Sequence, residues 1–313
     1  MPRKRQIRPD PSDGPLAKWF TKKYGPLSLE TAISGVVQDL LAKTNQANPP
    51  VALKPIASLR AIARTIYSAR IAGLGRLDPT SEGFVVLLER NWHWLKRREW
   101  WAHEIAHTFF YDIAPRPPRR LIPTAEEEEL ICDLLAREFL IPSAFLNCSD
   151  TTPRSPSFLE LRRLCKLFQT TTSTMSLRLI SDLKIWNAIV LFCEDRQHMF
   201  PASKQIRNPG RALRVVHTIG PGSSGSFVPL NKRVDEIVII HNAFTERRFF
   251  KGSVSFDNFG DLNGEKEVEA FPIISGSTGN PGVMVMIKSS HTSHTPKQRD
   301  VANVDTKELS FHF

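Results

Sequence analysis

The stretch REWWAHEIAHTFFYD, residues 98–112, contains the pattern on which the fold assignment depends. At its centre stands His103-Glu104-Ile105-Ala106-His107, with two histidines four residues apart and a glutamate directly after the first. On an α-helix, residues four apart lie on the same face, so His103 and His107 can aim a ring nitrogen at one point. The spacing therefore predicts a helix that supplies two ligands of a metal site, with zinc as the expected ion.

The residues between and around the histidines fit that interpretation. Glu104 points beside the ion, which suits a general base that takes a proton from an attacking water and passes it to the leaving amine. An apolar lining for the helix comes from Trp100, Trp101, Ile105, Ala106, Phe109 and Phe110. Two histidines at this spacing can equally be packed or surface residues bonded to nearby carbonyl groups, so a third ligand has to decide.

A second helix is the expected source of that ligand. The metzincin pattern is excluded, because Phe110 and Ile113 occupy the places where it requires Gly and a third His. The segment PTAEEEELICDLLAREFLIP, residues 123–142, begins instead with a cluster of acids, for which Thr124 and Glu127 predict a capping box. Such clusters also occur as solvated groups that stabilise a helix start.

Helical periodicity distinguishes one acid of the cluster from the others. Glu129 shares a face with Cys132 and Ala136, so it is predicted to turn toward the interior, where a carboxylate needs a partner such as a metal. Glu127 is predicted to turn outward, and Glu126 is the second choice as ligand. The sequence thus predicts one Zn²⁺ ion held by His103, His107 and Glu129, with Glu104 as the catalytic residue.

Composition limits what the motif can belong to. The chain has 313 residues, 41% of them hydrophobic and 24% charged, which predicts a globular protein with two domains or one domain and an appendage. No apolar run approaches the length of a membrane span, so no membrane partner is expected. The cysteines, Cys132, Cys148, Cys165 and Cys193, show neither paired zinc spacing nor a disulfide framework. A reducing, cytoplasmic location is the corresponding expectation.

The net charge of +10 raises the question of nucleic-acid binding. Residues 1–25 alone contain seven basic and two acidic side chains, and Pro2, Pro9, Pro11 and Pro15 disfavour a helix there. We therefore expect a disordered basic tail over residues 1–25. Much of the excess charge lies in this tail, so only a weak contact of the basic surface with nucleic acid is expected.

The remaining segments alternate between helical and strand-like patterns. Ser28 caps an expected helix over residues 28–44, residues 51–66 repeat the helical pattern, and GFVVLLERN, residues 83–91, predicts a strand. TTPRSP, residues 151–156, predicts a linker, followed by two short helices with a break at residues 169–173. Beyond Trp186, six runs predict strands: residues 189–193, 213–219, 235–244, 253–257, 267–274 and 282–288. His217 and His241, in two of these runs, are expected to be ordinary packed or surface residues.

The combination of these motifs resembles the ImmA/IrrE metallopeptidases. The resemblance rests on Arg98 ahead of HEIAH and on ELICDLLAREFLIP, with Glu129, Cys132-Asp133, Ala136 and residues 139–142 in the family's places. It covers roughly residues 28–185 and includes a Pro-rich joint before the strand. This sequence departs from the family at Glu99-Trp100, usually Phe-Thr, and at Ala106, usually Gly; neither change removes a metal ligand.

The resemblance implies a gluzincin-type zinc protease, often stress-linked, that cuts a DNA-bound transcriptional repressor. It also implies a helix-turn-helix-like module in the helical pair after the linker. Sensor-bearing members carry a GAF-like domain beyond that pair, whereas the strand signals here favour a small β-sheet domain of unknown type. A protein substrate, such as a helix-turn-helix repressor, is the expected partner.

The resulting prediction is an α+β protein. It comprises a basic tail (1–25), a mainly helical zincin-like domain with a short sheet (26–150), a helix-turn-helix-like module (151–186), a β-rich C-terminal domain (187–290) and a second tail (291–313). The expected activity is zinc-dependent endopeptidase, with Tyr111 or His93 as candidate oxyanion donors. The competing hypothesis is a non-proteolytic regulator that binds DNA or a repressor, or acts as an antitoxin, with a structural or vestigial metal site.

Overall fold

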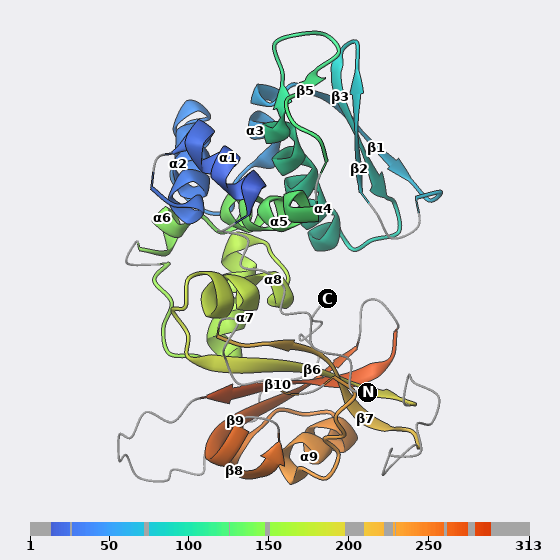
Figure 1. Cartoon of the computed structure of the whole chain (residues 1–313). Coiled ribbons are helices and arrows are strands. Elements are labelled where there is room, and N and C mark those ends of the chain that lie inside the picture. Colours follow the sequence, from blue (N-terminus) through green and yellow to red (C-terminus); the bar gives the residue numbers. More distant parts are fainter. Residues whose placement is uncertain are drawn as a thin grey trace. The chain divides into compact units, whose positions relative to one another are not determined.

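A computed structural model of the chain contains two compact units (Figure 1). The structure describes residues 14–25, 27–71, 75–124, 126–147, 151–197, 210–221, 228, 230–259, 262–274 and 279–288. The first unit contains residues 1–152 and 165–170, and the second contains residues 153–164 and 171–313. The first thirteen residues of the expected basic tail, the expected C-terminal tail and Cys148 lie outside the described residues.

The first unit combines helices with a small sheet. Its helices are α1 (Pro15–Tyr24), α2 (Leu29–Lys43), α3 (Leu53–Leu59), α4 (Trp94–His107), η2 (Thr108–Phe110), α5 (Glu126–Leu140) and α6 (Ser143–Leu146). Its strands are β1 (Ile62–Ser68), β2 (Arg76–Thr80), β3 (Gly83–Glu89), β4 (Tyr111–Asp112) and β5 (Arg119–Arg120). Ser28 caps α2 by accepting the N–H of Thr31, and β3 is the strand expected before the motif helix.

The prediction of a disordered tail through residue 25 is wrong for α1. Pro15 stands in the first turn, where its missing N–H removes no intrahelical bond, so proline does not oppose this helix. Leu16, Ala17 and Phe20 are buried on one side of α1. Phe20 packs against Tyr24 and against Phe109 and Phe110 just after the motif helix, with ring centroids 4.7–6.4 Å apart. Burial of this apolar side makes α1 part of the first unit's core.

The helical pattern expected over residues 51–66 is correct only in its first half. Helix α3 ends at Leu59, and Ala61 adopts a left-handed backbone conformation with φ of 59°. The chain then continues as β1, whose β-branched residues pair in parallel with β3. Ile66, expected on the helix face, is instead exposed on this strand.

The sheet of the first unit has the strand order β1-β3-β2. The central strand β3 is almost completely buried, and α4 contacts both β3 and β2. Strand β2 pairs antiparallel with β3 and, among the described residues, has no partner on its other side. Pro79 within β2 is consistent with an edge strand, because proline cannot donate to a ladder. The motif helix therefore lies beside a sheet edge.

The second unit is built on a five-stranded antiparallel sheet with the order β7-β6-β10-β9-β8. The strands are β6 (Ala188–Arg196), β7 (Ala212–Ile219), β8 (Phe250–Phe259), β9 (Leu262–Ile274) and β10 (Pro281–Lys288). Helix α9 (Val238–Glu246) contacts β8, β9 and β10, as Figure 1 shows. Ile240 and Ala243 of α9 join alternate residues of the strands in one apolar core. The expected β-rich C-terminal region is therefore confirmed.

One of the six strand predictions is wrong, because residues 238–246 form helix α9. The run VIIH, residues 238–241, favours a strand because it is short and rich in β-branched residues. In the structure it begins helix α9, which buries only Ile240 and Ala243. Arg247 ends the helix in the left-handed conformation, with φ of 56°. Tertiary packing against the sheet thus overrides the local β propensity.

The helical pair after the linker is present. Helix α7 (Phe158–Phe168) is followed by a break at Gln169, with φ of 53°, and by α8 (Thr172–Ser176), which continues as a π-helical segment, η3 (Leu177–Asp182). In the division of the chain, residues 165–168 of α7 belong to the first unit, whereas residues 158–164, α8 and η3 belong to the second. Helix α8 contains five residues and no basic side chain.

The α+β class predicted for the chain is confirmed by this combination of helices and sheets. In the part of the chain that the structure describes, no helix combines the length and the apolar character needed to cross a membrane. Cys132, Cys165 and Cys193 are free thiols.

Candidate metal centre

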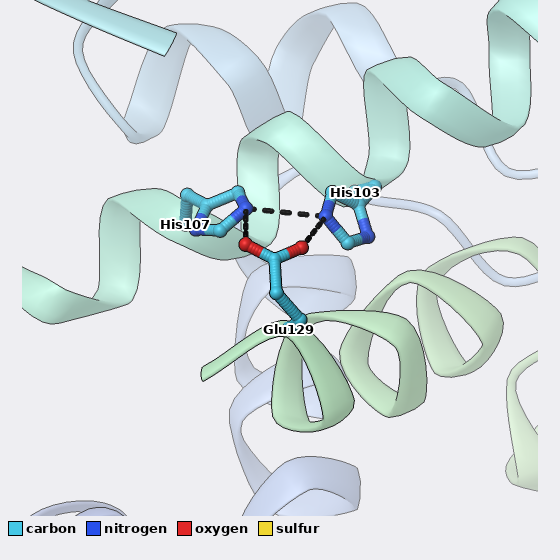
Figure 2. A group of neighbouring side chains, drawn as sticks. All are labelled: His103, His107 and Glu129. Atoms are coloured by element: carbon cyan, nitrogen blue, oxygen red, sulfur yellow. Dashed lines mark hydrogen bonds and ion pairs between the residues drawn. The ribbon is translucent and has the colours of Figure 1, made fainter. Parts of the chain in front are cut away.

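His103, His107 and Glu129 meet at the contact between α4 and α5, within the first unit (Figure 2). The two Nε2 atoms of the histidines lie 3.1 Å apart. Glu129 Oε2 lies 3.1 Å from His103 Nε2, and Glu129 Oε1 lies 3.6 Å from His107 Nε2. The one-turn spacing of the histidines thus produces the convergence that the motif predicts.

The opposite nitrogen of each ring is bonded to a carboxylate of α5. His103 Nδ1 lies 3.0 Å from Asp133 Oδ1, and His107 Nδ1 lies 2.8 Å from Glu128 Oε1. A carboxylate at Nδ1 favours the tautomer that carries its proton there, which leaves the Nε2 lone pair free. Both lone pairs are then directed toward Glu129. Asp133 and Glu128 were not predicted in these roles, although each lies within four residues of Glu129.

The donor set suits a metal ion. In a tetrahedral zinc site with bonds of about 2.0–2.1 Å, neighbouring donor atoms lie roughly 3.3–3.4 Å apart. The two nitrogens lie 3.1 Å apart, and each lies 3.1 or 3.6 Å from a different oxygen of the Glu129 carboxylate, all close to that separation. Two imidazoles and one carboxylate can therefore hold a divalent ion and leave a fourth position open.

Glu129 occupies its predicted place for a different reason than expected. Its side chain is 62% exposed, whereas neighbouring Glu128 has a side chain only 2% exposed. Glu129 therefore reaches the histidines from the solvent side of α5 and is not drawn in by apolar neighbours. The imidazoles of His103 and His107 lower the pKa of Glu129, chiefly through the hydrogen bond from His103. The prediction that Glu129 turns inward is wrong, while its position beside both histidines agrees with a ligand role.

The other acids at the start of α5 also differ from expectation. Glu127 does not turn outward to complete a capping box: its Oε2 accepts the N–H of Leu16, 2.9 Å away, and so holds the start of α1. Glu126, the second choice as ligand, is exposed and is not among the residues that converge.

The imidazole of His103 is a stronger base than usual, because its neighbours raise its pKa. Burial favours its neutral form, but the hydrogen bonds to Asp133 and Glu129 outweigh burial and raise the pKa of His103 to about 9. The acids around the imidazole therefore stabilise positive charge at this point, whether a proton or a metal ion supplies it.

Glu104 is buried, interacts electrostatically with His103, His107 and Glu129, and is not one of the residues whose ligand atoms converge. Burial raises the pKa of Glu104, while the imidazoles of His107 and His103 oppose that rise. Gly75, just before β2, approaches this carboxylate so closely that a Cβ there would lie 2.4 Å from Glu104 Oε1. The start of the edge strand therefore lies directly against the candidate base.

Aromatic side chains border the same region. The ring of Trp100 lies 5.3 Å from that of His103 and stacks on Trp92 at 5.3 Å. A Cβ at Gly75 would also lie 3.2 Å from Trp100 Cε3. Trp100, one of the departures from the ImmA/IrrE pattern, therefore contacts both the start of the edge strand and a candidate metal ligand.

The two candidate oxyanion donors have other positions. His93 is the N-cap of α4, where its Nδ1 accepts the N–H of Leu95. It lies ten residues before His103, about 15 Å along the helix axis. The Tyr111 hydroxyl accepts from Arg120, whose guanidinium also pairs with Glu128 behind His107. Tyr111 thus belongs to the Nδ1 side of His107 and not to the side where the donors converge.

Further candidate ligands are few in the described part of the chain. Cys132 lies near His107 Nδ1 and Glu128, and this trio forms a second group with metal-ligand spacing. Burial strongly raises the pKa of Cys132, and Arg120 already neutralises Glu128, so a second cation is not favoured there. His217 and His241, both exposed, belong to neither group.

Comparison with known proteins adds little to this geometry. No family model matches the chain, and no curated protein matches its sequence. A solved structure of a Mycobacterium tuberculosis transcriptional regulator is similar to this chain at 11% sequence identity and a TM-score of 0.45. That alignment covers 87% of this chain and 91% of the other. A likeness this distant carries no inference about function.

Proposed function

We propose that the chain is a zinc-dependent endopeptidase of the ImmA/IrrE type, with His103, His107 and Glu129 as zinc ligands. The observation that carries the proposal is the convergence of three ligand atoms next to a buried glutamate that is not itself a ligand. A metal site built only for structure needs no such glutamate and is usually closed by four protein ligands.

The side chains have separate roles in peptide hydrolysis. A bound zinc ion would supply Lewis-acid activation of the attacking water and of the scissile carbonyl. Glu104 accepts the proton of that water and transfers it to the leaving amine, a task suited to a carboxylate whose pKa burial has raised. Asp133 and Glu128 hold the imidazoles in the tautomer that binds the ion.

The edge strand β2 is the proposed docking site for the substrate chain. An edge strand presents unpaired backbone groups, and an extended peptide can add to them as a further strand. Gly75 at the start of β2 lies against both Glu104 and Trp100, so a peptide on this edge passes the candidate base and the Trp92–Trp100 stack. We infer that an apolar side chain of the substrate contacts this stack.

The proposed substrate is a regulatory protein such as a helix-turn-helix repressor, in the cytoplasm, where free cysteines persist. The competing interpretation, a regulator that reads DNA through its own helical pair, has less support. The second helix of that pair, α8 with its continuation η3, has one basic side chain, Arg178, which is buried beside Asp182, whereas groove-reading helices present polar and basic side chains to the base edges.

Glu104→Gln tests the proposed function. We expect this variant to bind one zinc ion per chain, as the wild type does, and to cleave peptides about 10²–10⁴-fold more slowly. Metal content is measured by elemental mass spectrometry, and cleavage with a mixed peptide library analysed by mass spectrometry. Wild-type cleavage that persists undiminished in Glu104→Gln would sink the proposed mechanism.

A further inference from the structure

The carboxylate behind His107 differs from the one behind His103. Glu128 has a side chain only 2% exposed, whereas the side chain of Asp133 is 54% exposed. Water solvates an exposed carboxylate, but a buried one needs protein partners for both of its oxygens. His107 Nδ1 contacts only one of the two Glu128 oxygens, so the other oxygen needs a partner of its own.

Arg120 supplies a permanent positive charge to Glu128. Its Nη2 forms an ion pair with Glu128 Oε2, while Glu128 Oε1 remains on His107 Nδ1. The carboxylate is therefore shared between a guanidinium on one oxygen and an imidazole on the other. Because the guanidinium is charged at any ordinary pH and grips the oxygen that faces away from His107, it fixes the orientation of the Glu128 carboxylate toward His107 Nδ1.

The hairpin of β4 and β5 fixes the guanidinium in place. Arg120 pairs across this hairpin with Tyr111, and its Nη1 donates to the Tyr111 hydroxyl at 3.1 Å. Its Nε donates to the carbonyl of Ile122 at 2.8 Å, and the guanidinium lies 5.2 Å from the centre of the Tyr111 ring. Three of its contacts are thus made within residues 111–122, outside the two helices that carry the ligands.

We propose that Arg120 and Glu128 are a positioning pair that holds His107 in its metal-binding tautomer. The hairpin formed by β4 and β5 then becomes part of the metal centre, although none of its residues touches the ion. This inference rests on the proposed function, in that it assumes a metal ion bound by His107 Nε2. Loss of Arg120 leaves the buried Glu128 carboxylate without its cation, and loss of Glu128 leaves His107 Nδ1 without its acceptor, so either change lets the His107 ring turn.

Arg120→Met and Glu128→Gln test the proposal through zinc affinity, measured on the full chain by competition with a chromogenic chelator. We expect each variant to bind zinc about 10–100-fold more weakly than the wild type. Arg120→Lys, which restores the charge but not the forked geometry, should recover part of the loss. Asp133→Asn should lose less affinity than Glu128→Gln, because Asp133 is largely solvated.

Two matched variants control for charge and location. Arg119 is the exposed neighbour of Arg120 on β5, and Glu126 is exposed in the same turn of α5 as Glu128. Arg119→Met and Glu126→Gln should leave zinc affinity within twofold of the wild type. The absorption spectrum of the cobalt-substituted protein adds a readout of ligand geometry, which should change in Arg120→Met and stay unchanged in Arg119→Met.

The outcomes separate this inference from the proposed function. If the wild-type chain binds no zinc, both the proposed function and this inference are wrong. If the wild type binds zinc and Arg120→Met and Glu128→Gln bind it with the same affinity, only this inference is wrong. If Glu128→Gln does not fold, judged by circular dichroism, the comparison of Arg120→Met with Arg120→Lys and Arg119→Met decides. Equal zinc affinity in those three variants would contradict a positioning role.

Discussion

At the scale of single residues, Gly75 is the position where one added carbon has the largest expected effect on the candidate site. In Gly75→Ala the new Cβ would lie 2.4 Å from Glu104 Oε1, so the carboxylate has to move away from its present position. We expect peptide cleavage to fall about 10–100-fold, because a shift of roughly 1 Å in a catalytic group has that effect. Zinc content, which does not depend on Glu104, should stay at the wild-type value.

Gly35→Ala on α2 is the matched control for that substitution. A Cβ at Gly35 meets no atom within 4 Å, and alanine favours a helix over glycine by roughly 0.5–1 kcal/mol. This variant should cleave peptides at the wild-type rate and unfold at a slightly higher urea concentration. A loss of cleavage in both glycine variants would mean that the effect at Gly75 is not specific to Glu104.

The site residues differ in how far sequence alone could predict them. His103, Glu104 and His107 follow from spacing on one helix, because helical geometry brings residues four apart together. Glu129 lies beside both histidines, as predicted. The burial that helical periodicity predicts for it is wrong, since its side chain is exposed. Arg120 and Glu128 were missed because their pairing joins two different elements, and four consecutive glutamates give no local sign of which one is buried.

At the scale of elements, α1 is a structural part of the first unit. Phe20 is fully buried and packs on Phe109 and Phe110, directly after the motif helix. We expect Phe20→Ala to lower the free energy of unfolding by about 3–5 kcal/mol, the usual effect of removing a buried ring. Urea unfolding followed by circular dichroism measures the loss.

Leu27→Ala provides the comparison for Phe20→Ala. Leu27 is 81% exposed in the connection to α2, so its removal should change the unfolding free energy by less than about 0.5 kcal/mol. Equal stability of Phe20→Ala and the wild type would contradict the packing described for α1.

Two of the errors in element prediction, those over residues 62–68 and 238–246, share a physical cause. Residues 62–68 and 238–246 are short apolar runs, for which periodicity does not distinguish helix from strand. Pairing with β3 makes the first run a strand, and packing on the five-stranded sheet makes the second run helix α9. In contrast, α2 and β3 were predicted correctly because a cap or a clear burial pattern marks each of them locally.

At the scale of the whole molecule, the second unit contains a charged cluster that links its sheet to α7. Lys288 lies 2.8 Å from carboxylate oxygens of both Glu267 and Glu269, and buried Glu269 also accepts the N–H of Phe158. Although burial opposes it, these bonds raise the pKa of Lys288 above its ordinary 10.5. The ammonium group therefore stabilises the fold fully below pH 10.5 and loses this effect as the pH rises through the raised pKa.

Lys288→Met should lower the free energy of unfolding by about 1–3 kcal/mol near neutral pH, because Glu269 keeps a buried charge with fewer partners. The difference from the wild type should shrink above pH 10.5, where the wild-type ammonium loses its proton. Urea unfolding between pH 7 and pH 11 measures both effects. Lys54→Met, which removes an exposed charge from α3, should show neither.

The division of the chain into two units was predictable only in outline. Alternating apolar patterns predicted most strands of the second unit, and so its β-rich character. The strand order β7-β6-β10-β9-β8 and the assignment of α7 to both units depend on contacts between residues far apart in sequence. No local pattern contains that information.

The proline in β2 has a consequence for how the protein behaves at high concentration. A free strand edge is a template on which identical chains can assemble into fibres. Pro79 lacks an amide hydrogen, and β2 is only five residues long, so a continuous ladder cannot propagate along it. The edge proposed for substrate docking can thus stay open while resisting permanent self-assembly.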